Sequence, residues 1–510
     1  MTVFELVLLL LLGGVALSLL APRLGVPWPA LLAVGGAGLA FVPGMPAVQL
    51  DPDLALALFV APVLLDAGYD TSPRDLRANW APIGSLVLVA VGLTVACVAA
   101  VAHGMAPQMP WAAAVALGAI VAPPDAAAAT SVLRQVRLPH RMMVVLEGES
   151  LLNDASALLI YRVAVGAVAG GLGVWTAPSL VLAVVGGVAL GHGLARLYLL
   201  AVARLDGGPA SVVLQFLGTF GVWLLAEAMG LSAVLTMVAY AVTLARTVHG
   251  RTGARQRRTA YAVWEVAIFV LNVLAFVLIG LQLRGILDRL DGGVWQAAGF
   301  AAAVLAVTIL ARLAWVLAYG AVTRRLLRHR RTAQPLPTVQ GSVVVAWCGM
   351  RGIVTLAAAL ALPEGFPSRD LIVFTAFCVV LGTLVLQGMT LRPLLARVTM
   401  APDDSVAEEL ALARRESAIA VLAGLRDAFG TEAGHVLQQD YKARLKPEHA
   451  ASAMAGLRRR ALAIERATVL GMLREGRIGD DAYHQLEEVL DWAEAEADPV
   501  QPDPTRPDPV

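Results

Sequence analysis

Residues 147–154 read Glu-Gly-Glu-Ser-Leu-Leu-Asn-Asp and lie inside an otherwise apolar stretch, 143–169, that is long enough to cross a bilayer. The stretch therefore carries two carboxylates, Glu149 and Asp154, to a depth where water is scarce. A charged side chain near the bilayer centre costs on the order of 3 kcal/mol on insertion scales, so such residues normally face a polar cavity and handle ions or protons. We therefore predict that the chain moves a small cation.

The composition is that of a membrane protein. Of its 510 residues, 58% are hydrophobic and only 15% are charged, and the mean hydropathy is +0.72; a soluble chain carries about 25% charged residues. The net charge is only +1, and we expect the lipid bilayer as partner and no nucleic acid. We predict a transmembrane domain over 1–397, a helical cytoplasmic tail over 398–496 and a disordered, Pro-rich end over 497–510.

Apolar windows predict an all-α polytopic fold with about 13 membrane-spanning segments. The alternate loops of this arrangement hold most of the arginines, and the intervening loops hold only Arg284, Arg289 and Arg369. Because cytoplasmic loops accumulate Lys and Arg, the N-terminus is expected outside, the tail inside, and the protein in the cell (inner) membrane. The predicted segments are 3–21, 28–43, 53–68, 83–103, 111–134, 143–169, 176–201, 210–229, 231–247, 261–283, 294–319, 340–362 and 371–391.

Three charged residues from three segments are predicted to reach the same depth. At 1.5 Å per helical residue, Asp154 lies roughly 16 Å from the cytoplasmic end of its segment, close to the midplane. Arg351 reaches the same depth in the twelfth segment, and Asp125 falls in the central zone of the fifth. We expect these side chains to converge.

The backbone around two of these residues is predicted to be interrupted. Asp125 follows Pro123 and Pro124, which lack amide donors and clash with the preceding helical turn. Arg351 lies between Gly349 and Gly352, which weaken a helix and permit close approach. Interrupted segments at corresponding places in two halves of a transporter indicate inverted repeats with a binding site between them. We therefore expect two discontinuous crossing helices, in segments 5 and 12.

Other polar residues in the membrane carry weaker signals. Glu147 lies near the same helical face as Asp154 and is a candidate for the cytoplasmic entrance. Four residues are expected mainly to satisfy partners between helices: Arg312, Glu227, Glu265 and Asn272. The three cysteines lack the CxxC spacing of metal sites, and no cofactor is expected beyond the transported ions.

Three strings now permit a comparison with a known family. They are Val-Ala-Pro-Pro-Asp125, Leu-Glu-Gly-Glu-Ser-Leu-Leu-Asn-Asp154 and Trp-Cys-Gly-Met-Arg351-Gly-Ile-Val-Thr-Leu-Ala. They resemble the motifs of the electroneutral sodium/proton exchangers, the Asn-Asp branch of the monovalent cation:proton antiporters. The resemblance covers residues 1–400 and extends to Gly-Thr-Leu-Val-Leu-Gln-Gly-Met-Thr-Leu-Arg392-Pro. It implies a 13-span inverted-repeat fold with a core and a dimerisation part, hence a homodimer.

The resemblance also implies residue roles. Asp154 matches the family's ion- and proton-carrying carboxylate, and Ser150, one turn earlier, matches an ion-coordinating hydroxyl. Asn153 occupies the position of a second Asp in electrogenic relatives, which implies exchange of one cation for one proton. Asp125 matches the acid of the unwound crossing, so Na⁺ is expected at Asp154, Asp125 and Ser150. Glu149 and Arg351 match a buried ion pair that stabilises the core.

One position departs from the family pattern. The usual Thr-Asp-Pro is Pro124-Asp125-Ala126 here, so residue 124 can offer a cation only its main-chain carbonyl. Na⁺ remains the expected cation, with K⁺/H⁺ antiport as the alternative.

Two other classes of protein stay open on sequence grounds. A cation channel is the nearest, although no filter-like Thr-Val-Gly-Tyr-Gly loop occurs. An intramembrane aspartyl protease built on Asp125 and Asp154 is remote, because the spacings typical of such enzymes are missing. Competition between a proton and a cation for one buried carboxylate suffices for an exchanger, and we expect a transporter and no enzyme.

Overall fold

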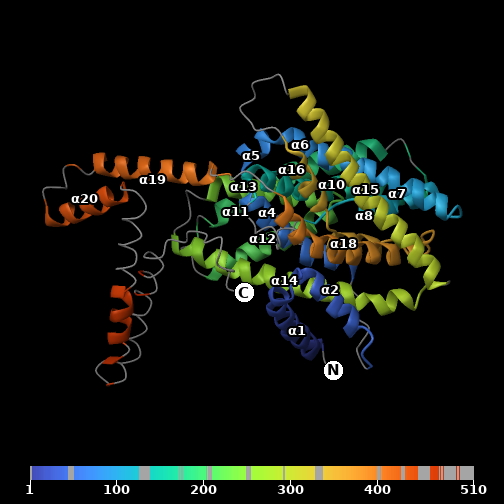
Figure 1. Cartoon of the computed structure of the whole chain (residues 1–510), viewed down its shortest axis with the longest axis horizontal. Coiled ribbons are helices and arrows are strands. Elements are labelled where there is room, and N and C mark those ends of the chain that lie inside the picture. Colours follow the sequence, from blue (N-terminus) through green and yellow to red (C-terminus); the bar gives the residue numbers. More distant parts are fainter. Residues whose placement is uncertain are drawn as a thin grey trace. The chain divides into compact units, whose positions relative to one another are not determined.

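The structure is a computed structural model of the whole chain (Figure 1). It describes residues 3–43, 51–125, 138–171, 173, 176–202, 204, 209–248, 254–290, 293–327 and 337–398, and in the C-terminal part residues 403, 405–424, 426, 431–445, 460–469, 471–472, 475, 490 and 493. The chain divides into two units, residues 1–401 and 402–509.

All regular structure in the described ranges is helical. The first unit contains α1 (Val3–Leu24), α2 (Trp28–Leu39), α3 (Pro52–Ala55), η1 (Leu56–Val60), α4 (Ala61–Asp70), α5 (Pro73–Ala78), α6 (Trp80–Gly84), η2 (Ser85–Ala90), α7 (Val91–Met105), α8 (Trp111–Val121), α10 (His140–Ala169), α11 (Thr176–Val202), α12 (Pro209–Ala228), α13 (Ala233–Val248), α14 (Ala254–Leu287), α15 (Val294–Leu327), α16 (Val339–Trp347), α17 (Ile353–Leu360) and α18 (Arg369–Arg397). The second unit contains α19 (Ser405–Gly424) and α20 (Glu432–Arg444). Here η1 and η2 are π-helical turns.

Eight helices in the described ranges are long and apolar enough to cross a membrane, and α2, α8 and α13 are shorter apolar helices. Every one of the 13 predicted segments contains helix, so the predicted all-helical polytopic membrane fold is confirmed. The number of crossings and the inverted repeat stay predictions. The predicted continuation of the fifth segment over 126–134 and the Pro-rich end over 497–510 lie outside the described residues.

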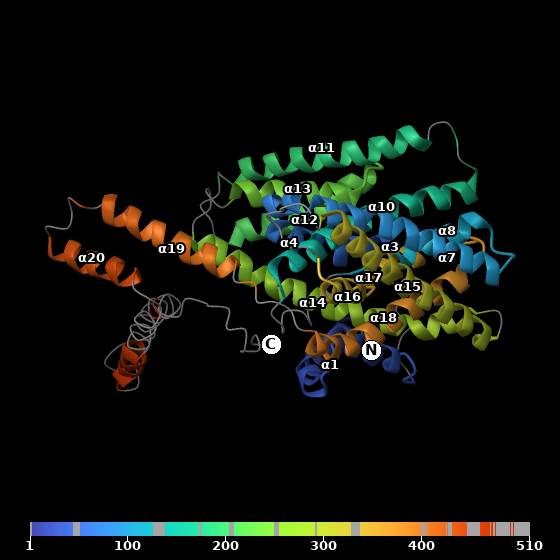
Figure 2. The same cartoon turned by 45° about the horizontal axis from the view of Figure 1, so that its top comes forward.

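Glycines allow two helix pairs to approach closely. The main chain of Val277 in α14 occupies the position that a Cβ would take at Gly36 of α2. In the same way, the main chain around Ala33 occupies the Cβ position at Gly280 of α14. Gly191 of α11 lies in the same way against the main chain of α13, and these two helices run side by side in Figure 2. Small residues serve this purpose in membranes, where no hydrophobic effect drives helices together.

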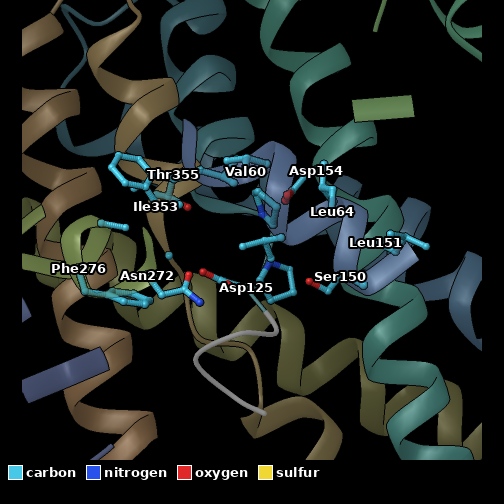
Figure 3. Close-up of a pocket in the computed structure, with 18 residues that line it drawn as sticks. Val60, Leu64, Asp125, Ser150, Leu151, Asp154, Asn272, Phe276, Ile353 and Thr355 are labelled. Atoms are coloured by element: carbon cyan, nitrogen blue, oxygen red, sulfur yellow. The ribbon is translucent and has the colours of Figure 1, made fainter. Parts of the chain in front are cut away.

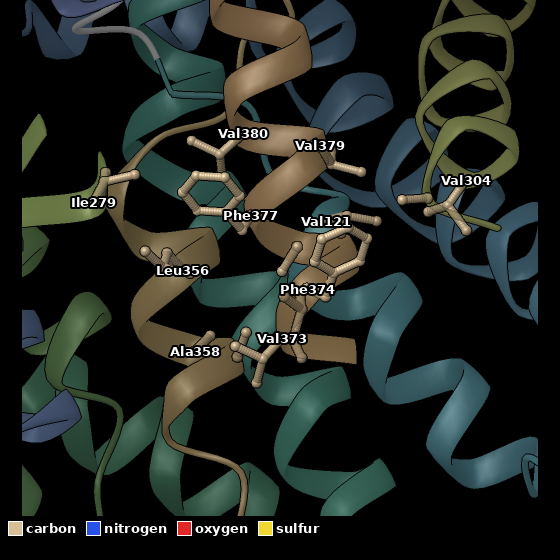
Figure 4. Packing of buried hydrophobic residues seen from close by; sticks show 14 of the residues in the cluster. Val121, Ile279, Val304, Leu356, Ala358, Val373, Phe374, Phe377, Val379 and Val380 are labelled. Atoms are coloured by element: carbon tan, nitrogen blue, oxygen red, sulfur yellow. The ribbon is translucent and has the colours of Figure 1, made fainter. Parts of the chain in front are cut away.

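The largest buried cluster surrounds the two short helices α8 and α17. Phe374 and Phe377 of α18 point into it (Figure 4) and are 4% and 2% exposed. Val121 of α8, Val304 of α15 and Leu356 of α17 meet them from three sides. Close packing on all sides holds two helices that are too short to span a membrane alone, and this fixes the position of their ends.

Replacing Gly280 by Ala is expected to destabilise the protein by about 1–3 kcal/mol, because the new methyl group meets the main chain of α2. Gly285 of the same helix is the control, since a Cβ there meets nothing within 4 Å. Gly285→Ala should be neutral or stabilising by up to about 1 kcal/mol through helix propensity. The measurement is thermal denaturation in detergent; a Gly280→Ala protein as stable as the Gly285→Ala protein would contradict the packing argument.

Candidate ion-binding site

Two interrupted helices meet in the interior of the first unit. α8 ends at Val121 and residues 122–125 are not helical, while a second gap at 348–352 separates α16 from α17. The backbone N–H of Asp125 donates to the carbonyl of Met350 at 2.7 Å, which joins the two interruptions directly. The chain is non-helical at both predicted breaks, and the two non-helical stretches touch. The two discontinuous crossing helices stay a prediction.

Proline and glycine cause these breaks in different ways. Pro123 and Pro124 cannot donate to the preceding turn, so the ladder of α8 stops before them. At Gly352 the carboxylate of Asp125 occupies the space where a Cβ would stand. At Gly349 the side chain of Arg312 comes within 2.5 Å of the position that a Cβ of residue 349 would take. The glycines are needed for close approach, as well as for weakening the helix.

Arg351 closes the end of α8. It is fully buried, and its Nε donates to the carbonyl of Val121 at 2.9 Å while Nη2 donates to Ala122 at 3.2 Å. Nη1 donates to the carbonyl of Gly349, and the main-chain N–H of Arg351 donates to Thr383 of α18 at 3.0 Å. The last carbonyls of a helix lack intrahelical partners, and a cation at this end also complements the helix dipole.

The predicted partner of Glu149 is wrong. Glu149 forms a buried ion pair with Arg312 of α15, in which Nη1 approaches Oε1 and Nη2 lies 2.8 Å from Oε2. The two side chains are 1% and 3% exposed. Arg351 is instead directed to main-chain carbonyls, so the predicted pair of Glu149 and Arg351 does not form.

Arg312 also closes the end of α16. Its Nε donates to the carbonyl of Ala346 at 3.2 Å, and Nη2 donates to Val345 at 3.1 Å. From the sequence, Arg312 is expected mainly to satisfy partners between helices. The signal that would have identified it was its place within a span, since an intramembrane arginine normally pairs with a carboxylate or with backbone carbonyls.

A small cavity lies beside the meeting point of the two breaks (Figure 3). Asp125, Ser150 and Asp154 line it together with Asn272 of α14 and Thr355 of α17. Its volume is about 50 Å³, and one water needs roughly 10–15 Å³ on such a measure. The cavity can hold a small ion with a few waters, and it is too small for an organic substrate.

Helix α10 contributes two ligand candidates from one face. Ser150 and Asp154 are four residues apart, which is one helical turn, and both line the cavity. Asp154 is 8% exposed. The predicted set of Asp125, Ser150 and Asp154 is thus brought together around one space, although its role in binding an ion stays a proposal.

Asn153 faces the break and not the cavity. It is fully buried, and its Nδ2 donates to the carbonyl of Pro124 at 2.7 Å. This bond ties α10 to the interruption after α8. The Pro124 carbonyl therefore already accepts one hydrogen bond, and only its second lone pair is available to a cation. Within the described residues, Oδ1 of Asn153 has no partner.

The surroundings of the two cavity carboxylates differ. Asp125 lies against Gly352, the residue that precedes α17, and so stands at the N-terminus of that helix. The dipole of a helix favours negative charge at this end. Asp154 lies in the middle of α10. Asp125 is therefore placed where a helix dipole favours a negative charge.

Glu147 was predicted as a residue of the site, whereas the π-turn η1 was not predicted from the sequence. Glu147 is partly buried on α10 and is not among the residues that line the cavity, so its role at an entrance stays a prediction. The π-turn η1 supplies Phe59 and Val60 to the cavity wall. Single π-turns often occur at functional sites, but no sequence pattern predicted this one.

A helical membrane protein with interrupted helices around a buried, ion-sized, acidic cavity is a transporter of small ions. The family model described as "Sodium/hydrogen exchanger, transmembrane" matches residues 7–397. The chain belongs to this family.

Relatives agree with this assignment, and a solved structure has a similar fold. The chain is 32% identical to an uncharacterised Na⁺/H⁺ exchanger of Mycobacterium tuberculosis, over 94% of this chain and 93% of that protein. It is 30% identical to a sodium, potassium, lithium and rubidium/H⁺ antiporter of Bacillus pumilus, over 91% of this chain and 73% of that protein. The fold is similar to that of the sodium proton antiporter MjNhaP1 from Methanocaldococcus jannaschii, with a TM-score of 0.62, 18% identity, and 78% and 98% of the two chains covered.

Breaking the buried ion pair is expected to lower stability. Glu149→Gln or Arg312→Gln should each cost roughly 3–5 kcal/mol, because the remaining charge is left buried and uncompensated. A double-mutant cycle in detergent denaturation measures the coupling, which should be about 1–3 kcal/mol. The control cycle pairs Glu149→Gln with Arg351→Gln and should give a smaller coupling. Equal coupling in both cycles, or an unchanged stability of the Glu149→Gln protein, would contradict the assigned partner.

Proposed function

We propose that the protein exchanges a monovalent cation for H⁺ across the membrane, and that both ions compete for Asp154. The observation that carries this proposal is the placement of a buried carboxylate, a second carboxylate and a hydroxyl around one cavity of about 50 Å³. Hard cations prefer such oxygen ligands. A buried carboxyl group holds either a proton or a cation, and alternating exposure of the site to the two sides converts this competition into exchange.

The formal charges around the site support one-for-one exchange. Arg312 and Arg351 contribute two positive charges, and Glu149 and Asp125 contribute two negative charges. The formal charges of these four described residues cancel, and Asp154 is the further carboxylate that lines the cavity. It is neutralised equally by one proton or by one monovalent cation, and the neutral Asn153 adds no second exchangeable carboxylate.

We propose Na⁺ as the main cation, in keeping with the family. K⁺/H⁺ exchange remains the second candidate, because the Bacillus pumilus relative is described as an antiporter for sodium, potassium, lithium and rubidium. Pro124 supports a broad preference, since its side chain offers no hydroxyl that would tighten the site around a small ion. A channel is not favoured by the family assignment, and neither is a protease.

The remaining expectations also stay proposals. We propose that residues 1–397 divide into a moving core part and a dimerisation part, that two copies assemble, and that the protein resides in the inner membrane with its N-terminus outside. The support is the family assignment and the arginine-rich alternate loops. The helical tail faces the cytoplasm in this arrangement, and no cofactor is required beyond the transported ions.

Asp154→Asn is expected to abolish exchange, because the amide has a similar size but cannot hold a proton and a cation alternately. The measurement is cation-driven dequenching of a pH-sensitive dye in proteoliposomes, with Na⁺, Li⁺ and K⁺ added in turn. Asp288→Asn is the matched control, since Asp288 is 73% exposed at the end of α14 and outside the cavity. Cation-driven proton flux in the Asp154→Asn protein would reject the proposal.

A further inference from the structure

Helix α14 contributes one polar side chain to the cavity, that of Asn272. Asp125, Ser150 and Asp154 come from α10 and the break after α8. Asn272 and Phe276 of α14 lie on the other side of the cavity in Figure 3, and Asn272 is the polar member of the three α14 residues that line it, Asn272, Ala275 and Phe276. Figure 3 shows the amide of Asn272 and the carboxylate of Asp125 pointing toward one another across the cavity.

Packing holds Asn272 in this place. Phe276 follows it by four residues, lies on the same face of α14 and also lines the cavity. The ring of Phe276 meets Trp28 of α2 edge-to-face at 5.9 Å. One turn later, Gly280 brings the backbones of α14 and α2 into contact. The orientation of this face is thus set by two contacts that do not involve the acidic residues.

The chemistry of the amide suits a cation ligand. An amide offers a carbonyl oxygen without adding a charge. No hydrogen bond joins the Asn272 side chain to another described residue, so its oxygen remains available. Asp125 and Asp154 supply the negative charge from the other wall, and a cation between the walls can contact both.

We propose that Asn272 is a cation-binding residue that sets the affinity for the transported cation from the wall opposite Asp125 and Asp154. This inference rests on the proposed exchange function and adds a ligand to the same site. A proton on Asp154 needs no shell of oxygen ligands, whereas a partly dehydrated cation does. Asn272 therefore acts on cation binding and leaves proton binding unchanged.

The test compares transport by four proteins in proteoliposomes: wild type, Asn272→Leu, Asn272→Asp and Gln215→Leu. Gln215 is the matched control, because it is a partly buried amide on α12 that does not line the cavity. Asn272→Leu removes one oxygen ligand and should raise KM for Na⁺ roughly three- to tenfold, the equivalent of one modest polar contact. Its rate at saturating Na⁺ should stay within about twofold of wild type. Asn272→Asp should have a KM at or below that of wild type, and Gln215→Leu should resemble wild type.

Several outcomes would overturn the inference. It fails if KM for Na⁺ in the Asn272→Leu protein equals that of wild type, if only the saturated rate falls, or if Gln215→Leu raises KM equally. If Asn272→Leu does not fold, Asn272→Asp decides, and a KM several-fold above that of wild type counts against the inference. A wild-type protein without any cation-driven proton flux would instead reject the proposed function itself.

Discussion

The whole arrangement depends on supplying hydrogen-bond donors to main-chain carbonyls at a depth where water is scarce. A helix that stops inside a membrane exposes carbonyls that cost several kcal/mol each unless they find a partner. Two arginines supply these partners: Arg351 at the end of α8 and Arg312 at the end of α16. Interrupted helices are therefore tolerated, and their ends can carry a binding site.

Closing helix ends with arginines brings positive charge close to the cavity. Glu149 compensates Arg312 directly, and Asp125 stands at the start of α17, where a helix dipole favours an anion. Among the described residues at the crossing, Glu149 is thus paired with Arg312 and Asp125 lies at a helix N-terminus, while Asp154 is the carboxylate that we propose to exchange. The structural requirement for satisfied carbonyls and the functional requirement for one exchangeable charge are met by the same few residues.

Much of the site was predictable because it depends on local sequence. Pro123 and Pro124 remove two amide donors, Gly352 weakens a helix, and Ser150 and Asp154 share a face through the helical period alone. Partner choice was not predictable in this way. Arg312 and Arg351 have the same chemistry and lie at similar depth, and only the packing of α15 against α16 decides which of them reaches Glu149. For Asn272 the sequence predicts only a role in satisfying partners between helices, because a single sequence does not tell which face of α14 meets the cavity.

The central claim is that one carboxyl group serves both the proton and the cation. The most direct measurement is calorimetric titration of the purified protein with Na⁺ in buffers of different ionisation enthalpy, which counts the protons released as the cation binds. The account predicts about one proton per Na⁺ at pH values where Asp154 is protonated before binding, and no release from the Asp154→Asn protein. Binding of Na⁺ without proton release at every pH, or undiminished release from the Asp154→Asn protein, would contradict it.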